Sequence, residues 1–134
     1  MADTFQHHFH EGVDHFNRRE FWEAHESWEE LWLESRTELH QFLQGLIQLA
    51  AAYHHVKRGT FSGAVRLFDA AARKLGDFPP IFCGIDRTDA MAAAAVHHDW
   101  IATRIGSEER LEADAFPTLK LLPAQVSSMP NDEW

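Results

Sequence analysis

Cysteine and basic side chains are scarce in this chain. Among 134 residues there is one cysteine, Cys83, and 21 Asp and Glu outnumber 12 Lys and Arg, for a formal charge of −9. A single cysteine excludes an intramolecular disulfide, and an excess of negative charge repels nucleic-acid backbones and anionic bilayers alike. We therefore expect no nucleic-acid partner, no membrane partner and a reducing, cytoplasmic location.

Long apolar runs and fingerprints of known chemistry are missing as well. The longest run of small apolar residues, 90–96, ends at His97, well short of the ~20 residues that a membrane span needs. The N-terminal residues contain neither the basic n-region nor the apolar h-region of a signal peptide. The chain also lacks a phosphate-binding loop, a dinucleotide fingerprint and a nucleophile elbow, so its substrate and cofactor stay unknown.

What the chain does contain is apolar residues at helical spacing. Phe5, Phe9, Val13 and Phe16 recur at steps of four, four and three, which predicts an amphipathic first helix. Further helices are predicted over 19–34, 38–57, 61–75 and 87–105. The third of these helices is apolar on nearly all sides, which is typical of a helix at the centre of a bundle.

Polar residues and glycines mark the ends of these helices. Gly59 is suited to a left-handed cap, and Gly76 ends the following helix. Thr60 and Asp86 are predicted N-caps of the fourth and fifth helices, because their side-chain oxygens accept bonds from free backbone amides. No strand of useful length is predicted anywhere.

The C-terminal residues 107–134 contain three prolines and no lasting periodicity, which favours an extended tail. We expect four apolar side chains of this tail to pack back on the helices, namely Phe116, Leu119, Leu121 and Leu122. The chain as a whole is predicted to be an all-α single-domain bundle of about five helices over residues 1–134.

A polar constellation borders the aromatic residues of the second helix. At about 100° per residue, His25 and Glu29 lie about 40° apart, and Glu26 lies about 100° from His25. On the third helix Gln44, Gln48 and His55 share one narrow face. A short connection favours antiparallel packing of these two helices, so the two polar sets are expected to face each other.

Two interpretations of this constellation stay open. In the first, the polar groups satisfy one another, with His25 bonded to a carboxylate and the two glutamines supplying further bonds, and this network fixes the register of the helices. In the second, His25, Glu29 and His55 bind Zn²⁺, Mn²⁺ or Fe²⁺, and a spare glutamate, Glu26 or Glu29, acts as general base in hydrolysis. We favour the first, because glutamine is a poor metal ligand and a good member of a hydrogen-bond network.

Other candidate residues carry weaker patterns. His7, His10 and Asp14 fall on one face of the first helix, which we interpret as a solvated surface. His97, His98 and Asp99 are sequential and point in different directions, so a shared metal site is not expected there. We interpret Trp22 as the roof of a pocket and His54 as a packed core or interface residue. Cys83 has no basic activator near it in the sequence. A face formed by Ala90, Ala93 and Ala94 is suited to a homodimer contact.

Two motifs resemble those of a known protein family. The first is Phe21-Trp22-Glu23-Ala24-His25-Glu26 with Trp32, and the second is Gln44-Gly45-Leu46-Ile47-Gln48-Leu49-Ala50 with His55, Gly59 and Gly63-Ala64. Together they are similar to the DUF309 family of small all-helical proteins of unknown function, over roughly residues 9–75. The resemblance implies a bundle of about five helices, and a general label of metal-dependent hydrolase has been attached to such proteins.

From the sequence we therefore expect a structural or protein-interaction module, either a homodimer or a partner of another protein. The alternative is a metal-dependent hydrolase that uses His25, Glu26, Glu29 and His55. The ligand-binding or network residues in either case are Trp22, His25, Glu26, Glu29, Gln44, Gln48 and His55.

Overall fold

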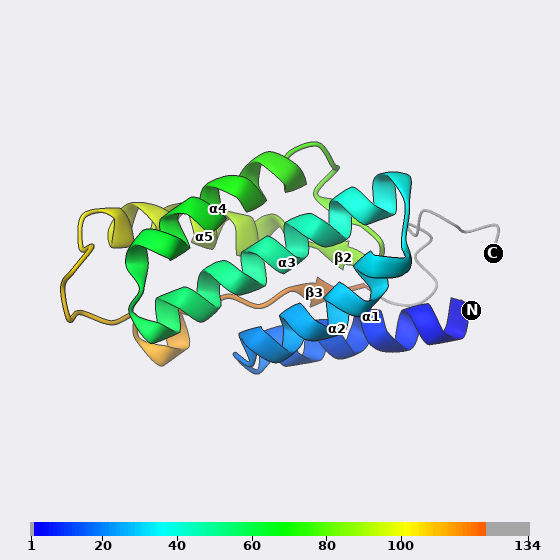
Figure 1. Ribbon diagram of the computed structural model, residues 1–134, viewed down its shortest axis with the longest axis horizontal. Helices are drawn as coiled ribbons and strands as arrows, with labels where there is room; N and C mark the ends of the chain where they lie inside the picture. The colour runs from blue at the N-terminus through cyan, green and yellow to red at the C-terminus, as the bar shows by residue number, and fades with distance from the viewer. Residues whose placement is uncertain (1, 123–134) are drawn as a thin grey trace.

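Five α-helices make up most of the molecule. The computed structural model describes residues 2–122, and Figure 1 traces the chain. The helices are α1 (Ala2–Asn17), α2 (Phe21–Glu34), α3 (Thr37–Arg58), α4 (Phe61–Leu75) and α5 (Thr88–Ala102). The all-α prediction is thus confirmed. The largest difference in bounds is at the end of α5, which stops at Ala102 rather than 105 because the chain turns there, Arg104 N donating to Ile101 O.

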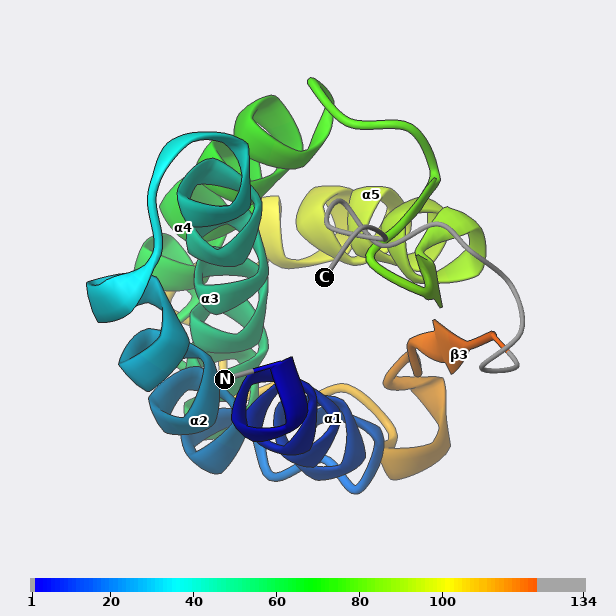
Figure 2. The same cartoon turned by 90° about the vertical axis from the view of Figure 1, so that its right-hand side faces the viewer.

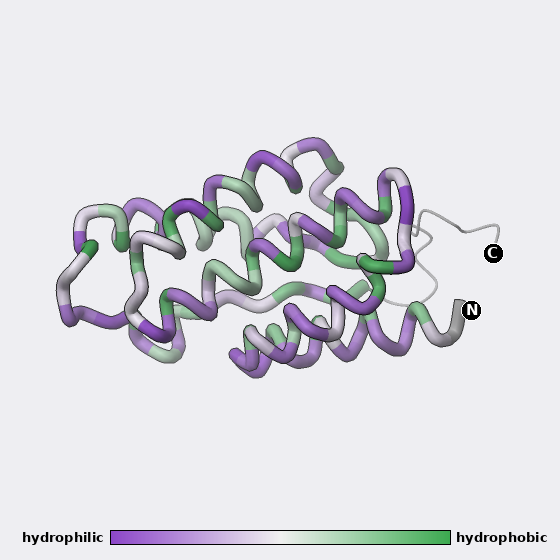
Figure 3. Tube along the Cα trace, viewed as in Figure 1, coloured by the Kyte–Doolittle hydropathy of each residue, from purple (hydrophilic) through white to green (hydrophobic). Residues whose placement is uncertain are grey.

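The helix α3 lies at the centre of the arrangement. It packs against α2 on one side and α4 on the other, while α1 packs on α2 and α5 on α4. Figure 2 looks along the bundle and shows this order, with α5 across from α2. Hydrophobic and hydrophilic stretches alternate along α3 and α4 in Figure 3. Each helix therefore buries the apolar face that the helical spacing of its apolar residues predicts.

A fully buried tryptophan joins α1 to α2. The Trp28 side chain is 0% exposed, and its Nε1 donates a hydrogen bond to the Phe9 carbonyl at 3.1 Å. A Cβ atom on Gly12 would lie 2.2 Å from that same nitrogen. Only glycine therefore allows the α1 backbone to approach the indole so closely.

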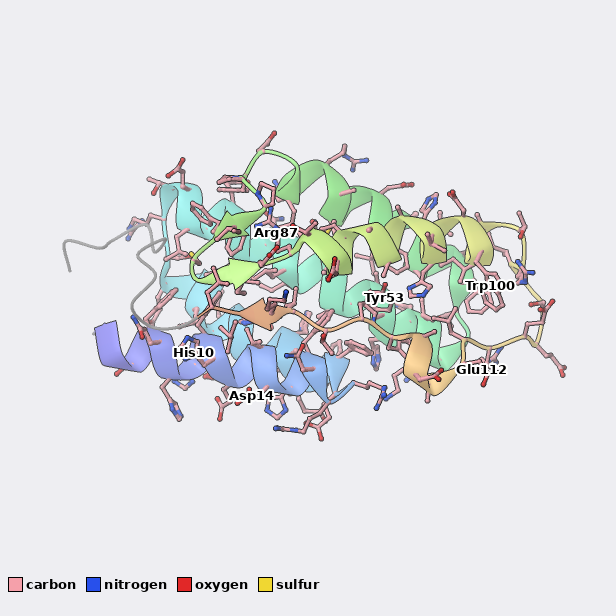
Figure 4. All side chains as sticks on the ribbon, turned by 180° about the vertical axis from the view of Figure 1, so that it is seen from behind. His10, Asp14, Tyr53, Arg87, Trp100 and Glu112 are labelled. Carbon is pink, nitrogen blue, oxygen red and sulfur yellow. The ribbon has the colours of Figure 1, made fainter. Side chains whose placement is uncertain are left out.

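A buried tyrosine–histidine pair joins α3 to α5. The Tyr53 hydroxyl and His97 Nδ1 are 2.7 Å apart, and Figure 4 shows Tyr53 inside the bundle. Burial raises the pKa of Tyr53 and lowers the pKa of His97. Both shifts favour the neutral forms, so the phenol O–H donates to a neutral imidazole. The Tyr53 ring also contacts four phenylalanines, which are Phe16, Phe21, Phe68 and Phe116.

The structure also contains a small antiparallel sheet of three strands, which the sequence did not predict. Its strands are β1 (Ile81–Phe82), β2 (Ile85–Asp86) and β3 (Lys120–Leu121), in the order β1-β2-β3. Cys83 and Gly84 connect the first two with φ of 56° and 76°, and positive φ at both central residues is typical of a tight hairpin turn. Strands of two residues are too short to show a period in the sequence.

The C-terminal segment is fastened to α1. Asn17 Nδ2 donates to the Leu119 carbonyl at 2.9 Å, and Leu119 N donates to Asn17 Oδ1 at 2.7 Å. As predicted, Leu119 is buried and Phe116 packs on the core, whereas Leu121 is exposed. Residues 123–134 of the predicted tail lie outside the described part of the chain.

One of the three predicted caps is formed as expected, because Gly59 adopts a left-handed conformation with φ of 80°. Asp86 was predicted as the N-cap of α5, but the N-cap is Arg87; Asp86 ends β2, and its Oδ1 accepts a bond from Thr88 N, the first residue of the helix. The Thr60 hydroxyl does not cap α4, because it bonds His55 instead. Within residues 2–122, no helix has the length and apolarity to cross a membrane.

Candidate functional site

The helix α2 presents four residues to solvent along one line. It buries Phe21, Ala24, Trp28 and Leu31 in the core. On the opposite side Trp22, Glu26, Glu29 and Leu33 follow one another at steps of four, three and four, and all are exposed. Such steps keep side chains on one face of a helix. We call these four residues the α2 stripe.

The Trp22 end of the stripe is an aromatic cluster that includes α3. The Trp22 indole stacks on the His25 imidazole with centroids 4.6 Å apart, and it lies 5.2 Å from the His54 ring. Trp22 nevertheless stays 46% exposed. Burial lowers the pKa of His54, and the nearby positive groups of His55, Arg58 and Lys57 lower it further, while Glu23 opposes them.

The other end of the α2–α3 contact holds a second stacked pair. The Trp32 and His40 rings lie 4.5 Å apart at 23°, and His40 Nδ1 is 2.9 Å from the Trp32 carbonyl. The Ser35 hydroxyl also bonds that carbonyl. The turn between α2 and α3 is thereby tied to the first residues of α3.

Three buried polar atoms on α2 and α3 have no hydrogen-bond partner within residues 2–122. They are His25 Nδ1, Trp32 Nε1 and Gln48 Oε1. A buried polar atom without a partner costs about 1–3 kcal/mol. The expected network is therefore not formed: Glu26 and Glu29 point to solvent, His25 bonds neither of them, and Gln44 is only partly buried.

The predicted metal ligands are not gathered in one place. His55 turns toward the α3–α4 connection, where Nδ1 lies 2.6 Å from the Thr60 hydroxyl, and Glu29 is exposed on the far side of α2. Across residues 2–122, no three His, Cys, Asp or Glu side chains are placed to hold a metal ion. The residues that the structure does bring together are Trp22, His25 and His54.

The structure also shows where the candidate residues with weaker sequence patterns lie. His7, His10 and Asp14 are exposed, and Figure 4 shows the last two on α1. Cys83 is buried in the hairpin turn, and burial raises its pKa to about 12. A neutral buried thiol is a poor nucleophile.

The site residue that the sequence analysis missed is His54. It was expected to pack in the core or an interface, and His55 was placed in the site instead. The two side chains leave α3 about 100° apart, so the angle at which α2 crosses α3 decides which of them meets Trp22. The sequence did offer one indication of His54. Trp22 lies at the start of α2, and in an antiparallel pair the start of α2 lies opposite the end of α3, where His54 is found.

Comparison with known proteins adds a family but no activity. Residues 9–67 match the family model described as a domain of unknown function, DUF309. The match spans α2 and α3 with both motifs, and it confirms the resemblance noted in the sequence. No curated protein matches the chain.

Proposed function

Since the family model that residues 9–67 match is described only as a domain of unknown function, DUF309, we propose from the geometry of the site that the protein is an interaction module. It binds a basic, amphipathic segment of a partner protein on the α2 stripe. Trp22 and Leu33 are the apolar anchors, and Glu26 and Glu29 pair with positive side chains between them.

The observation that carries the proposal is the pair of exposed apolar side chains at the ends of the stripe. Trp22 is 46% and Leu33 71% exposed, and they are separated by about 16 Å along the helix axis. Tryptophan is prominent among residues that dominate binding energy at interfaces. Stacking on His25 holds the indole in place, which reduces the entropy lost on binding.

The charge of α2 defines the chemistry of the partner. The helix contains five glutamates and no lysine or arginine: Glu23, Glu26, Glu29, Glu30 and Glu34. All five are exposed. A partner helix with apolar residues at one face and lysine or arginine beside them is complementary to this surface.

The proposal is tested by selection from a random peptide library displayed on phage. We expect enrichment of peptides that combine Lys and Arg with aromatic or aliphatic residues. Binding of the selected peptides should weaken at least about tenfold in Trp22→Ala, weaken in Glu26→Gln/Glu29→Gln, and fall as salt rises.

Two matched variants serve as controls for that selection. Val96→Ala removes an exposed apolar side chain from α5, and Glu108→Gln removes an exposed carboxylate far from α2. Neither should change peptide affinity. Enrichment of acidic or neutral peptides, or affinity that Trp22→Ala leaves intact, would refute the proposal.

The metal-dependent hydrolase is the alternative, and metal content separates it from an interaction module. Tag-free protein and a His25→Ala variant are compared by elemental mass spectrometry. Near-stoichiometric metal in the wild type, lost in the variant, would favour the hydrolase over the interaction module.

A further inference from the structure

Two hollows lie end to end between α4 and α5. The first, of about 220 Å³, has Leu49, Phe68 and Met91 among its lining residues, and the second, of about 230 Å³, is lined in part by Leu75 and Phe78. Ala72 and Met91 line both hollows. They are therefore two parts of one apolar depression, which we call the α4–α5 groove.

Two carboxylates and an imidazole form one end of this groove. His98 Nε2 lies 3.0 Å from Asp69 Oδ1, and His98 Nδ1 lies 3.0 Å from Asp99 Oδ1. Two carboxylates therefore flank a single imidazole. The second oxygen of each carboxylate makes no hydrogen bond within residues 2–122.

The opposite end contains a cation that a ligand does not reach. Arg87 lines the second hollow but is only 3% exposed, and its Nη2 donates to the carbonyls of Leu75 and Phe78. Its Nε and Nη1 are buried and have no hydrogen-bond partner within residues 2–122. Figure 4 shows Arg87 at the start of α5. Arg87 thus joins α4 to α5, and the accessible charge in the groove is negative.

We propose that the α4–α5 groove binds a small organic cation. An ammonium group donates to Asp69 and Asp99 beside His98, and an apolar body lies along Phe68 and Met91. The shape supports this assignment, because the two hollows together fall within the range of small-molecule pockets. The charge supports it too, because a charge-assisted bond to a carboxylate is among the stronger hydrogen bonds. The groove is separate from the α2 stripe, so neither proposal depends on the other.

The test is an amide-detected NMR titration with three molecules of similar size. They are 2-phenylethylamine, which is cationic at neutral pH, the neutral 2-phenylethanol and the anionic 3-phenylpropionate. We expect the amine to bind about tenfold more tightly than the alcohol, and the carboxylate more weakly still. The shifted amides should lie in α4 from 69 to 76 and in α5 from 88 to 99.

Two variants and one control make the result specific. Asp69→Asn should reduce amine affinity about tenfold, and Ala95→Leu should abolish binding by filling the first hollow, which Ala95 lines. Asp114→Asn removes an exposed carboxylate from the 113–115 turn, and it should leave affinity unchanged. The unbound spectrum of each variant checks that it is folded.

Three outcomes would overturn the proposal. The first is equal binding of the amine and the alcohol. The second is shifts outside α4 and α5, or shifts that Ala95→Leu does not remove. The third is no amine binding while the same α5 amides move with protein concentration, which would assign the groove to a second copy of the chain.

Discussion

The polar groups inside the bundle and those between α2 and α3 differ in one respect. Inside, Trp28 bonds the Phe9 carbonyl and Tyr53 bonds His97. Between α2 and α3, His25 Nδ1 and Trp32 Nε1 have no partner within residues 2–122, and Gln48 Oε1 on α3 has none either. The paired groups position the helices, whereas the unpaired ones lower the stability of the isolated chain. Sites of function are where such local costs are expected to accumulate.

The largest loss of stability should come from the paired interior. Trp28→Ala removes a fully buried indole and its hydrogen bond, so we expect the free energy of unfolding to fall by about 3–5 kcal/mol. Urea denaturation followed by circular dichroism measures this. Trp22→Ala is the matched control, with an expected loss below about 1 kcal/mol. Equal losses in the two variants would remove the distinction between the regions.

A smaller loss is expected when one bond of the interior is removed without a change of shape. Tyr53→Phe leaves His97 Nδ1 buried without its donor, which should cost about 1–3 kcal/mol. The double variant Tyr53→Phe/His97→Phe should recover part of that loss, because no unpaired nitrogen then remains. Chemical denaturation of the four forms gives the coupling between the two side chains. Additive losses would mean that the bond contributes nothing.

Acidification should weaken the same interior pair. Burial lowers the pKa of His97 in the folded protein, so below the unfolded-state value of about 6.5 the unfolded chain binds more protons than the folded one. This contribution to stability is present above that pH and is lost as the pH falls. His54 acts in the same direction.

The measurement is the free energy of unfolding between pH 8 and pH 5, by urea titration. His97→Phe should flatten the decline, and His54→Gln should flatten it separately. An unchanged slope in both variants would contradict the assigned shifts.

The smallest effect should come from an unpaired group on α3. Gln48→Met keeps the side-chain volume and removes a buried acceptor that has no partner, so we expect a change within about 0.5 kcal/mol, or a gain in stability. Thermal unfolding by calorimetry measures this. A loss above about 1.5 kcal/mol would indicate that Gln48 is as well paired as Tyr53.

The helices were predictable because each carries its own period. The stripe from Phe9 to Phe16 and the nearly all-apolar α3 contain enough local information to specify helix and burial. The strands do not, since β3 pairs with β2 across a long stretch of sequence and is held next to Leu119, which bonds Asn17 on α1. The end of α5 was likewise overestimated, because helical periodicity does not indicate where a turn begins.

Part of the candidate site was predictable for the same reason. The positions of Trp22 and His25 on one side of α2 follow from helix geometry, and their stack bears that out. That His54 rather than His55 meets Trp22 depends on how α2 and α3 cross. That His98 pairs with Asp69 depends in the same way on how α4 and α5 cross. Crossing angles follow from packed side-chain shapes rather than from spacing along one helix.

The two hydrogen bonds between Asn17 and Leu119 have a consequence for the order of folding. They join residues 102 positions apart, so their closure carries the entropy cost of a long loop and contributes little until α1 is already in place. The contacts among α1 to α4 are closer in sequence and can form first. If unfolding reverses this order, we expect the segment around Leu119 to detach first, which would expose to water the Phe21 and Tyr53 rings that Phe116 contacts.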